Sequence, residues 1–112
     1  MSVVAIADMY GIAGRRQEML STLAESERHA AGQVDCLRYV FAETIAEPDH
    51  FVLISEWRNQ AALERHYGSE DFAGFQRALN GLLARPSEMT IHTVSGSSRP
   101  QPSGAMDPRD AD

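Results

Sequence analysis

The chain has 112 residues, 43% of them hydrophobic, which suits a single domain with a core of its own. Its formal net charge is −6 and it contains no run of Lys and Arg, so the composition argues against nucleic acid and anionic membranes as partners. No apolar stretch reaches the ~18–20 residues of a spanning helix. The first residues lack the charged segment of a signal peptide, and we therefore expect a cytoplasmic location and no membrane partner.

The first two predicted elements are a strand and a helix. Residues 3–9 are apolar and rich in small and branched side chains, which is typical of a strand. Residues 15–31 then place apolar side chains at a helical spacing in which Glu27 is a polar exception. Gly32 follows and predicts a left-handed stop to the helix.

A hairpin and two helices come next. Residues 36–44 and 51–58 predict two strands close enough in sequence to form a hairpin. Asn59 predicts the N-cap of a short helix, and Ser69 that of a second helix, which continues through an apolar stripe until Pro86 ends it.

The last predicted strand covers residues 88–94. Residues 96–112 are rich in Ser, Pro, Gly and Asp and contain few apolar anchors, so they cannot bury enough surface to offset the entropy of ordering. We therefore expect a folded domain over residues 1–95 and a disordered tail over residues 96–112.

The predicted order β-α-β-β-α-β is that of an α+β, ferredoxin-like fold, with helices on one face of an antiparallel sheet. A sheet with one solvated face alternates apolar and polar residues, but the hairpin strands are apolar at successive positions. One face is expected to carry Leu37, Tyr39 and Phe41, and the other Cys36, Val40 and Ala42. The same face of a second copy would cover the side that the helices leave open, which predicts a homodimer. The alternative is that an exposed strand tolerates some apolar residues.

Several motifs follow one another in a recognisable order. They are Cys36-Leu37-Arg38-Tyr39, the strand from Phe51 to Trp57, the helix segment Ala62-Leu63-Glu64-Arg65-His66, and Phe72 with Phe75. This succession resembles the antibiotic biosynthesis monooxygenase domain over the folded part of the chain and leaves out the tail. The resemblance implies a dimeric α/β barrel, in which two ferredoxin-like units pack sheet to sheet.

The resemblance also implies an activity. Characterised members include oxygenases that need neither metal nor flavin and act on quinols or aromatic polyketide rings. Dioxygen is a triplet and reacts poorly with closed-shell molecules, but an electron-rich phenolate or enolate can pass it one electron. We therefore expect a monooxygenase without cofactors that oxidises a small aromatic or quinol-type substrate with O2. Such an enzyme needs a base and a dry pocket that holds the substrate anion.

Trp57 and His66 are the candidate catalytic residues. Trp57 ends a predicted strand and His66 follows on a short helix, so the chain reversal between them brings both toward one end of a cavity. His66 is suited to act as a base or hydrogen-bond partner because the pKa of histidine lies near neutrality, and Trp57 would form a wall. The alternative is that the two residues pack and hydrogen-bond structurally.

Four further residues are candidates for substrate binding. Tyr39 and Tyr67 carry hydroxyls that could hold a phenolate oxygen, Phe72 belongs to the family's Ser-x-x-Phe segment, and Asp8 is an acid in an apolar strand. Each also has a structural interpretation, because a buried tyrosine needs one hydrogen-bond partner and Asp8 could point to the surface.

A metal site is not expected. Cys36 is the single cysteine, and the four histidines form no close pair of the kind that binds zinc. Family members that degrade haem use an Asn on the first strand together with a Trp and a His, whereas the first strand here has Ala7 and Asp8. Haem binding and a non-redox role in ligand binding or isomerisation stay open as alternatives, because one fold hosts many functions.

Overall fold

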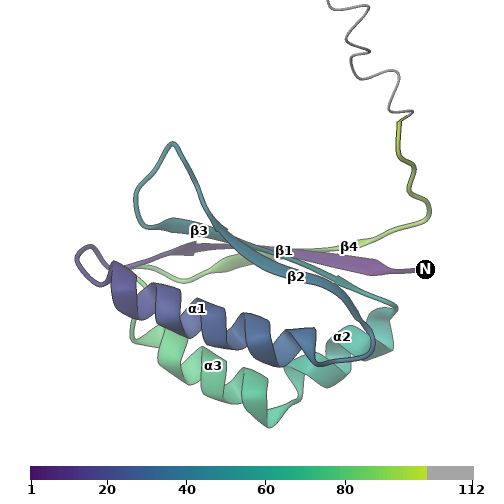
Figure 1. The fold of residues 1–112 in the computed structure, drawn as a ribbon, viewed down its shortest axis with the longest axis horizontal. Helices are drawn as coiled ribbons and strands as arrows, with labels where there is room; N and C mark the ends of the chain where they lie inside the picture. Colours follow the sequence, from purple (N-terminus) through teal and green to yellow (C-terminus); the bar gives the residue numbers. More distant parts are fainter. Residues whose placement is uncertain (101–112) are drawn as a thin grey trace, which may run out of the picture.

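The computed structural model describes residues 1–100, which form one sheet with helices packed against it (Figure 1). The elements follow the predicted order, and the second helical segment consists of a short helix followed by a longer one, as predicted. They are β1 (Val3–Tyr10), α1 (Arg16–Ala31), β2 (Cys36–Glu43), β3 (His50–Trp57), α2 (Gln60–Tyr67), α3 (Glu70–Asn80) and β4 (Glu88–Thr93).

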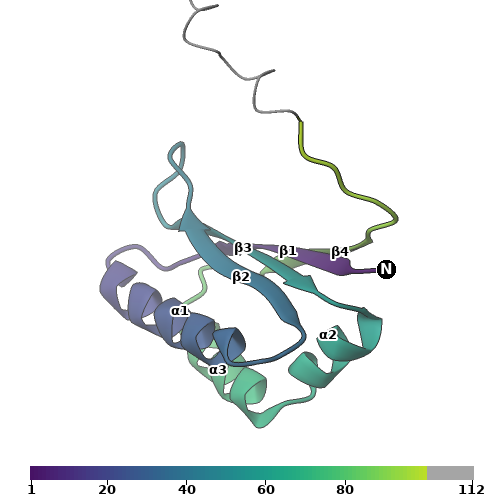
Figure 2. The same ribbon diagram turned by 45° about the vertical axis from the view of Figure 1, so that its right-hand side comes forward.

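The sheet has the order β2-β3-β1-β4, and each neighbouring pair of strands is antiparallel. Ala7 in the middle of β1 lies opposite Leu53 on β3 and opposite Met89 on β4. All the labelled helices lie on the same face of the sheet, and turning the molecule leaves them there (Figure 2). The α+β, ferredoxin-like prediction is confirmed.

The core lies on the helix-facing side of the sheet. Strands β1 and β3 alternate buried and half-buried residues along their whole length, because successive side chains of a strand point to opposite faces. The inward residues form a larger cluster with α1 and α3 and a smaller one with α2. The larger cluster contains Ala7, Met9, Met19, Leu23, Phe51, Leu53, Leu79 and Leu82, and the smaller one Val3, Trp57, Ala62 and Leu63.

The opposite face of the sheet, here called the open face, is apolar at its centre. Val4 and Ile6 on β1 and Val52 and Ile54 on β3 are partly exposed there. None of the helices in residues 1–100 covers them (Figure 2). The prediction that both faces of the sheet are apolar is confirmed.

The predicted facing of Leu37 is wrong because β2 contains a bulge. Cys36 pairs with Trp57 and Arg38 with Glu56, the next residue back along β3, so Leu37 is an extra residue in the ladder. Cys36 consequently packs on the helix side against the smaller cluster, whereas Leu37 is 47% exposed.

Two helix ends predicted from the sequence also differ from those in the structure. Gly32 has φ −81°, which is right-handed, and its amide donates to the carbonyl of His29, so α1 tightens into a turn instead of reversing. Helix α3 ends at Asn80, well before Pro86, because Leu83 leaves the helix to form an isolated β-bridge with Gly11. The left-handed conformation occurs instead at Gly14 and at Asp49 in the hairpin turn.

Most of the tail expected over residues 96–112 lies outside the residues that the structure describes, which end at residue 100. Val94 is still held to the sheet by its amide, which donates to the carbonyl of Ser2.

Across the described residues, no helix has both the length and the apolar character needed to cross a membrane.

The N-cap of α2 offers a test of what holds this part of the fold. The side chain of Asn59 accepts a hydrogen bond from the amide of Ala62 at 2.9 Å, as predicted from the sequence. We expect Asn59→Ala to lower the free energy of unfolding by about 1 kcal/mol, measured by urea denaturation. Asn59→Asp keeps the acceptor and should lose much less; an equal loss in both variants would show that the cap is not the stabilising contact.

Candidate functional site

A small cavity lies between the sheet and helices α2 and α3. This cavity, here called the inner pocket, has a volume of about 100 Å³. Each strand of the sheet contributes at least one side chain to it. Its lining residues are Ala7, Met9, Tyr39, Leu53, Ser55, His66, Tyr67, Phe72, Phe75, Gln76, Leu79, Ser87 and Met89.

Local sequence patterns bring these residues together. The alternation of β1 and β3 turns Ala7, Leu53 and Ser55 toward the helices, and the small Ala7 leaves space above the sheet. On α3 the lining residues include Phe72, Phe75 and Leu79, at the three- and four-residue spacing that places side chains on one face of a helix. The pocket is therefore mostly aromatic and aliphatic, with a few polar groups in its wall.

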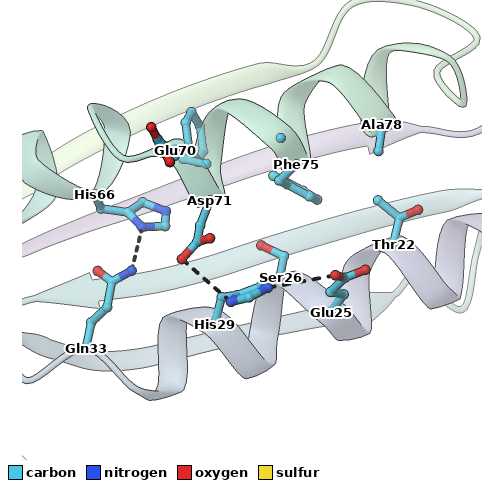
Figure 3. Close-up of a pocket in the computed structure, with 12 residues that line it drawn as sticks. Thr22, Glu25, Ser26, His29, Gln33, His66, Glu70, Asp71, Phe75 and Ala78 are labelled. Atoms are coloured by element: carbon cyan, nitrogen blue, oxygen red, sulfur yellow. Dashed lines mark hydrogen bonds and ion pairs between the residues drawn. The ribbon is translucent and has the colours of Figure 1, made fainter.

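His66 is the most constrained polar side chain of the pocket. It is 6% exposed, and its ring lies 4.6 Å from the ring of Trp57 and 5.0 Å from that of Phe72, measured between centroids. Its Nδ1 lies 3.4 Å from the side-chain amide nitrogen of Gln33, which follows α1 (Figure 3). Burial lowers the pKa of His66 to about 4, against a smaller opposing influence of Asp71, so the imidazole is neutral near pH 7.

Tyr39 supplies a hydroxyl beside His66. Its ring is edge-on to His66 at 5.6 Å, and its hydroxyl lies 2.9 Å from the Oγ of Ser26 on α1. Burial raises the pKa of Tyr39 to about 12, although the hydrogen bond with Ser26 acts in the opposite direction. Tyr39 therefore keeps its proton at neutral pH and can donate it in a hydrogen bond.

Tyr67 and Trp57 complete the aromatic surroundings. The Tyr67 hydroxyl donates to the Met89 sulfur at 2.9 Å, and burial raises the pKa of Tyr67. Trp57 is 1% exposed and lies behind His66, so it supports the imidazole without lining the inner pocket. Its indole Nε1 has no hydrogen-bond partner among residues 1–100.

The structure does not bring Asp8 to this pocket. Asp8 lies between Ala7 and Met9 on β1, so its side chain points to the open face of the sheet. There it pairs with Nε2 of His50 at 2.8 Å, and the His50 ring stacks on Tyr10 at 4.4 Å. The acid that interrupts the apolar strand therefore has a partner on the face opposite to His66.

Of the predicted site residues, the inner pocket thus unites Tyr39, His66, Tyr67 and Phe72. Phe75 is one of the family motif residues but not a predicted site residue, although its spacing of three residues from Phe72 places it on the same wall. Ser26 was not singled out at all. A signal existed, because Ser26 lies three residues after Leu23 and four before Ala30 on the buried stripe of α1, where a serine needs a hydrogen-bond partner.

A second and larger cavity adjoins the first. It lies between α1 and α3, has a volume of about 290 Å³, and is here called the outer cleft (Figure 3). His66, Phe72 and Phe75 line both cavities and so form the partition between them.

Among residues 1–100, no three side chains of His, Cys, Asp or Glu are grouped as metal ligands.

The pKa of His66 predicts how stability depends on pH. The unfolded chain binds a proton on this histidine at its ordinary pKa of 6.5, whereas the folded chain resists it down to about 4. The free energy of unfolding should therefore fall as the pH drops from about 7 to about 4.5, and His66 should account for about 2 kcal/mol of that fall.

Urea denaturation at both pH values checks this expectation. His66→Gln should show a pH dependence shallower by about that amount, and His92→Gln on the exposed strand β4 should keep the wild-type dependence. Parallel curves for the wild type and His66→Gln would contradict the burial of a neutral imidazole.

The fold and the sequence both have known relatives. An uncharacterised protein from Synechocystis, sll1783, is 34% identical over 74 residues; the match covers 66% of this chain, which spans only about half, 48%, of that protein. The Bacillus subtilis protein YcnE, named as a putative monooxygenase, is 27% identical over 81 residues, covering 72% of this chain and 85% of YcnE.

Among solved structures, SnoaB from Streptomyces nogalater is described as a cofactor-independent oxygenase. A crystal structure of a mutant of SnoaB superposes with a TM-score of 0.75 at 19% sequence identity, covering 86% of this chain and 95% of that one. Residues 2–78 match the family described as antibiotic biosynthesis monooxygenase. Because that match spans well over half of the sequence, the chain belongs to the antibiotic biosynthesis monooxygenase family.

Proposed function

We propose that this chain is a cofactor-independent monooxygenase that oxidises a small aromatic or quinol-type substrate with O2 in the inner pocket. The observation that carries the proposal is the juxtaposition of Tyr39 and His66, 5.6 Å apart between ring centroids, in the wall of a largely aromatic pocket. Both side chains are neutral near pH 7, so they can hold a phenolic oxygen without a competing ion pair. The family membership and the named relatives support the same class of reaction.

The reaction balances without an added reductant. A quinol that carries a ring hydrogen supplies four electrons to O2: one oxygen atom replaces that hydrogen, the ring becomes a hydroxyquinone, and the other oxygen atom leaves as water. The first step is electron transfer from the substrate anion to triplet O2, which removes the spin barrier. A pocket that excludes water favours this step because it limits side reactions of the radical pair.

The pKa values assign different roles to the two polar residues. A phenol loses its proton near pH ~10, so transfer to an imidazole with a pKa of about 4 would cost about 8 kcal/mol. The side-chain amide of Gln33 donates to Nδ1 of the neutral ring, so the other ring nitrogen carries the hydrogen. His66 is therefore better suited to donate a hydrogen bond that orients the substrate oxygen than to hold its proton. The Tyr39 hydroxyl donates to the developing phenolate, which stabilises the charge on which the reaction with O2 depends.

We also place a homodimer in this proposal. The open face exposes a patch formed by Val4, Ile6, Val52 and Ile54, and the same patch on a second copy would cover it. The inner pocket lies on the other side of the sheet, so such a dimer would stiffen the sheet that forms the pocket floor without occupying the pocket.

Oxygen uptake with added hydroquinones tests the activity, after subtraction of autoxidation. We expect Tyr39→Phe and His66→Leu each to lower kcat/KM by about tenfold to a hundredfold, because each removes a hydrogen bond to a charged or charging oxygen. Gln17→Ala, on the exposed side of α1, is the matched control and should be unaffected. With isotopically labelled O2, one labelled atom should enter the product.

The same assay separates this proposal from a non-redox role. Stabilisation by quinols without oxygen uptake would contradict the monooxygenase and indicate a ligand-binding protein. Full turnover in both Tyr39→Phe and His66→Leu would retain the reaction but remove these residues from it.

Sedimentation tests the dimer. We expect the wild type to sediment as a dimer at micromolar concentration and Val52→Glu to sediment as a monomer, because a carboxylate on the open face would be buried without a partner. Val34→Glu introduces the same charge at a loop position that is 89% exposed and should leave the dimer intact. A monomeric wild type would overturn the proposed assembly.

A further inference from the structure

We infer that the hydroxyls of Tyr39 and Ser26 form a proton relay, which carries the phenolic proton of the substrate out of the inner pocket and into the outer cleft. This inference goes beyond the proposed function and rests on it for the placement of a phenol in the inner pocket. Ser26 does not touch the substrate in this scheme; it acts through Tyr39.

The two hydroxyls connect the two cavities. Tyr39 lines the inner pocket and Ser26 lines the outer cleft, and their oxygens lie 2.9 Å apart (Figure 3 shows the cleft side). Ser26 is 7% exposed, so the contact lies inside the protein. Either hydroxyl can donate to the other. A proton relay requires such a pair, because each transfer reverses the direction of the hydrogen bond.

The end of the inner pocket at Tyr39 is far from solvent on the opposite side of the sheet. Tyr39 lies on β2 and Met89 on β4, the two edge strands, which are three strand spacings or roughly 14 Å apart. Ser87 and Met89 are exposed, so the pocket meets solvent at the β4 side. A phenolic oxygen beside Tyr39 therefore needs a route through the protein to release its proton.

Three other polar side chains of the inner pocket end in groups that cannot pass a proton on. The Tyr67 hydroxyl donates to the sulfur of Met89, which has no proton to give. The Ser55 hydroxyl donates to a backbone carbonyl of β1. His66 already accepts at Nδ1 and carries its hydrogen on the other ring nitrogen, so it would have to become a buried cation. Tyr39 and Ser26 offer a path on which no group becomes charged.

The relay moves one proton across each link. The substrate hydroxyl gives its proton to the oxygen of Tyr39 while Tyr39 gives its own to Ser26, and Ser26 gives its own to solvent base in the outer cleft. Both hydroxyls stay neutral, so the burial that raises the pKa of Tyr39 to about 12 does not oppose the transfer. Tyr39 then donates its new hydrogen to the phenolate, which is the hydrogen bond that stabilises the anion.

The proton released to the cleft is recovered later in the reaction. Conversion of a quinol to a hydroxyquinone removes two hydrogens overall, and reduction of the second oxygen atom to water takes up the same number. The relay can therefore run outward before electron transfer and inward afterwards, and the enzyme ends unchanged.

Ionisable groups surround the hydroxyl pair on each element packed against it. Those near Tyr39 include Glu27, Cys36, His66 and Tyr67. Those that line the outer cleft with Ser26 are Glu25, His29, Glu70 and Asp71. Ser26→Ala and Ser26→Thr leave all these groups in place, so a difference between the two variants reports on the hydroxyl alone.

A pH jump without oxygen tests the relay independently of oxidation. The probe is para-nitrophenol, whose anion is yellow and forms near neutral pH, so that stopped-flow absorbance follows its loss of a proton. We expect the bound probe in the wild type to ionise at least about tenfold faster than it dissociates, and Ser26→Ala to slow ionisation to the rate of dissociation.

Two further variants serve as controls for the pH jump. Ser26→Thr keeps the hydroxyl and should ionise the probe at the wild-type rate. Thr22→Val removes a hydroxyl from the lining of the same cleft, one turn earlier on α1, and should also leave the rate unchanged. Ionisation that is no faster than dissociation in the wild type, or that Ser26→Ala does not slow, would overturn the inference.

Turnover with hydroquinone separates a relay from lost packing. We expect Ser26→Ala to lower kcat by about tenfold at neutral pH with little change in KM. This deficit relative to the wild type should disappear as the pH approaches ~10, because the substrate then enters as its anion. Lost packing would lower kcat alike at every pH, and a deficit of that kind would overturn the inference.

The relay and the oxidation are scored separately. If the probe ionises through Ser26 but no quinol consumes oxygen, the relay stands and the proposed oxidation fails. If quinols are oxidised equally well by the wild type and Ser26→Ala, the oxidation stands and the relay is overturned.

Discussion

The alternation of side chains along β1 and β3 is the constraint on which the rest of the structure depends. It turns Ala7, Leu53 and Ser55 toward the helices and Ile6, Asp8 and Ile54 away from them. One side of the sheet therefore becomes the floor of the inner pocket, and the other an uncovered apolar surface. Both the proposed chemistry and the proposed assembly follow from this division, because each uses a different side of the same two strands.

Burial of His66 links the fold to the proposed reaction. Packing between Trp57 and Phe72 removes the imidazole from water, which lowers the pKa of His66 to about 4 and keeps the ring neutral. The same low polarity raises the pKa of Tyr39 to about 12, so its hydroxyl stays a donor. Two neutral hydrogen-bond donors side by side suit a substrate that brings its own negative charge, and the proton must leave the substrate by another route than a basic histidine.

The two cavities differ in character because they lie between different layers. The inner pocket lies between sheet and helices, where the apolar faces of both meet, and its polar groups are few. The outer cleft lies between α1 and α3, and polar side chains of both helices line it. His66, Phe72 and Phe75 form the boundary between these two environments.

Local sequence patterns by themselves determined the element order, the caps at Asn59 and Ser69 and the apolar character of both sheet faces, because caps and strand periods are short-range signals. Only the tertiary structure decided the rest. The bulge that exposes Leu37, the pairing of Asp8 with His50 across 42 positions, the contact of Ser26 with Tyr39 and the outer cleft all arise where distant segments meet. Strand register and helix packing set such contacts, and no local pattern encodes them.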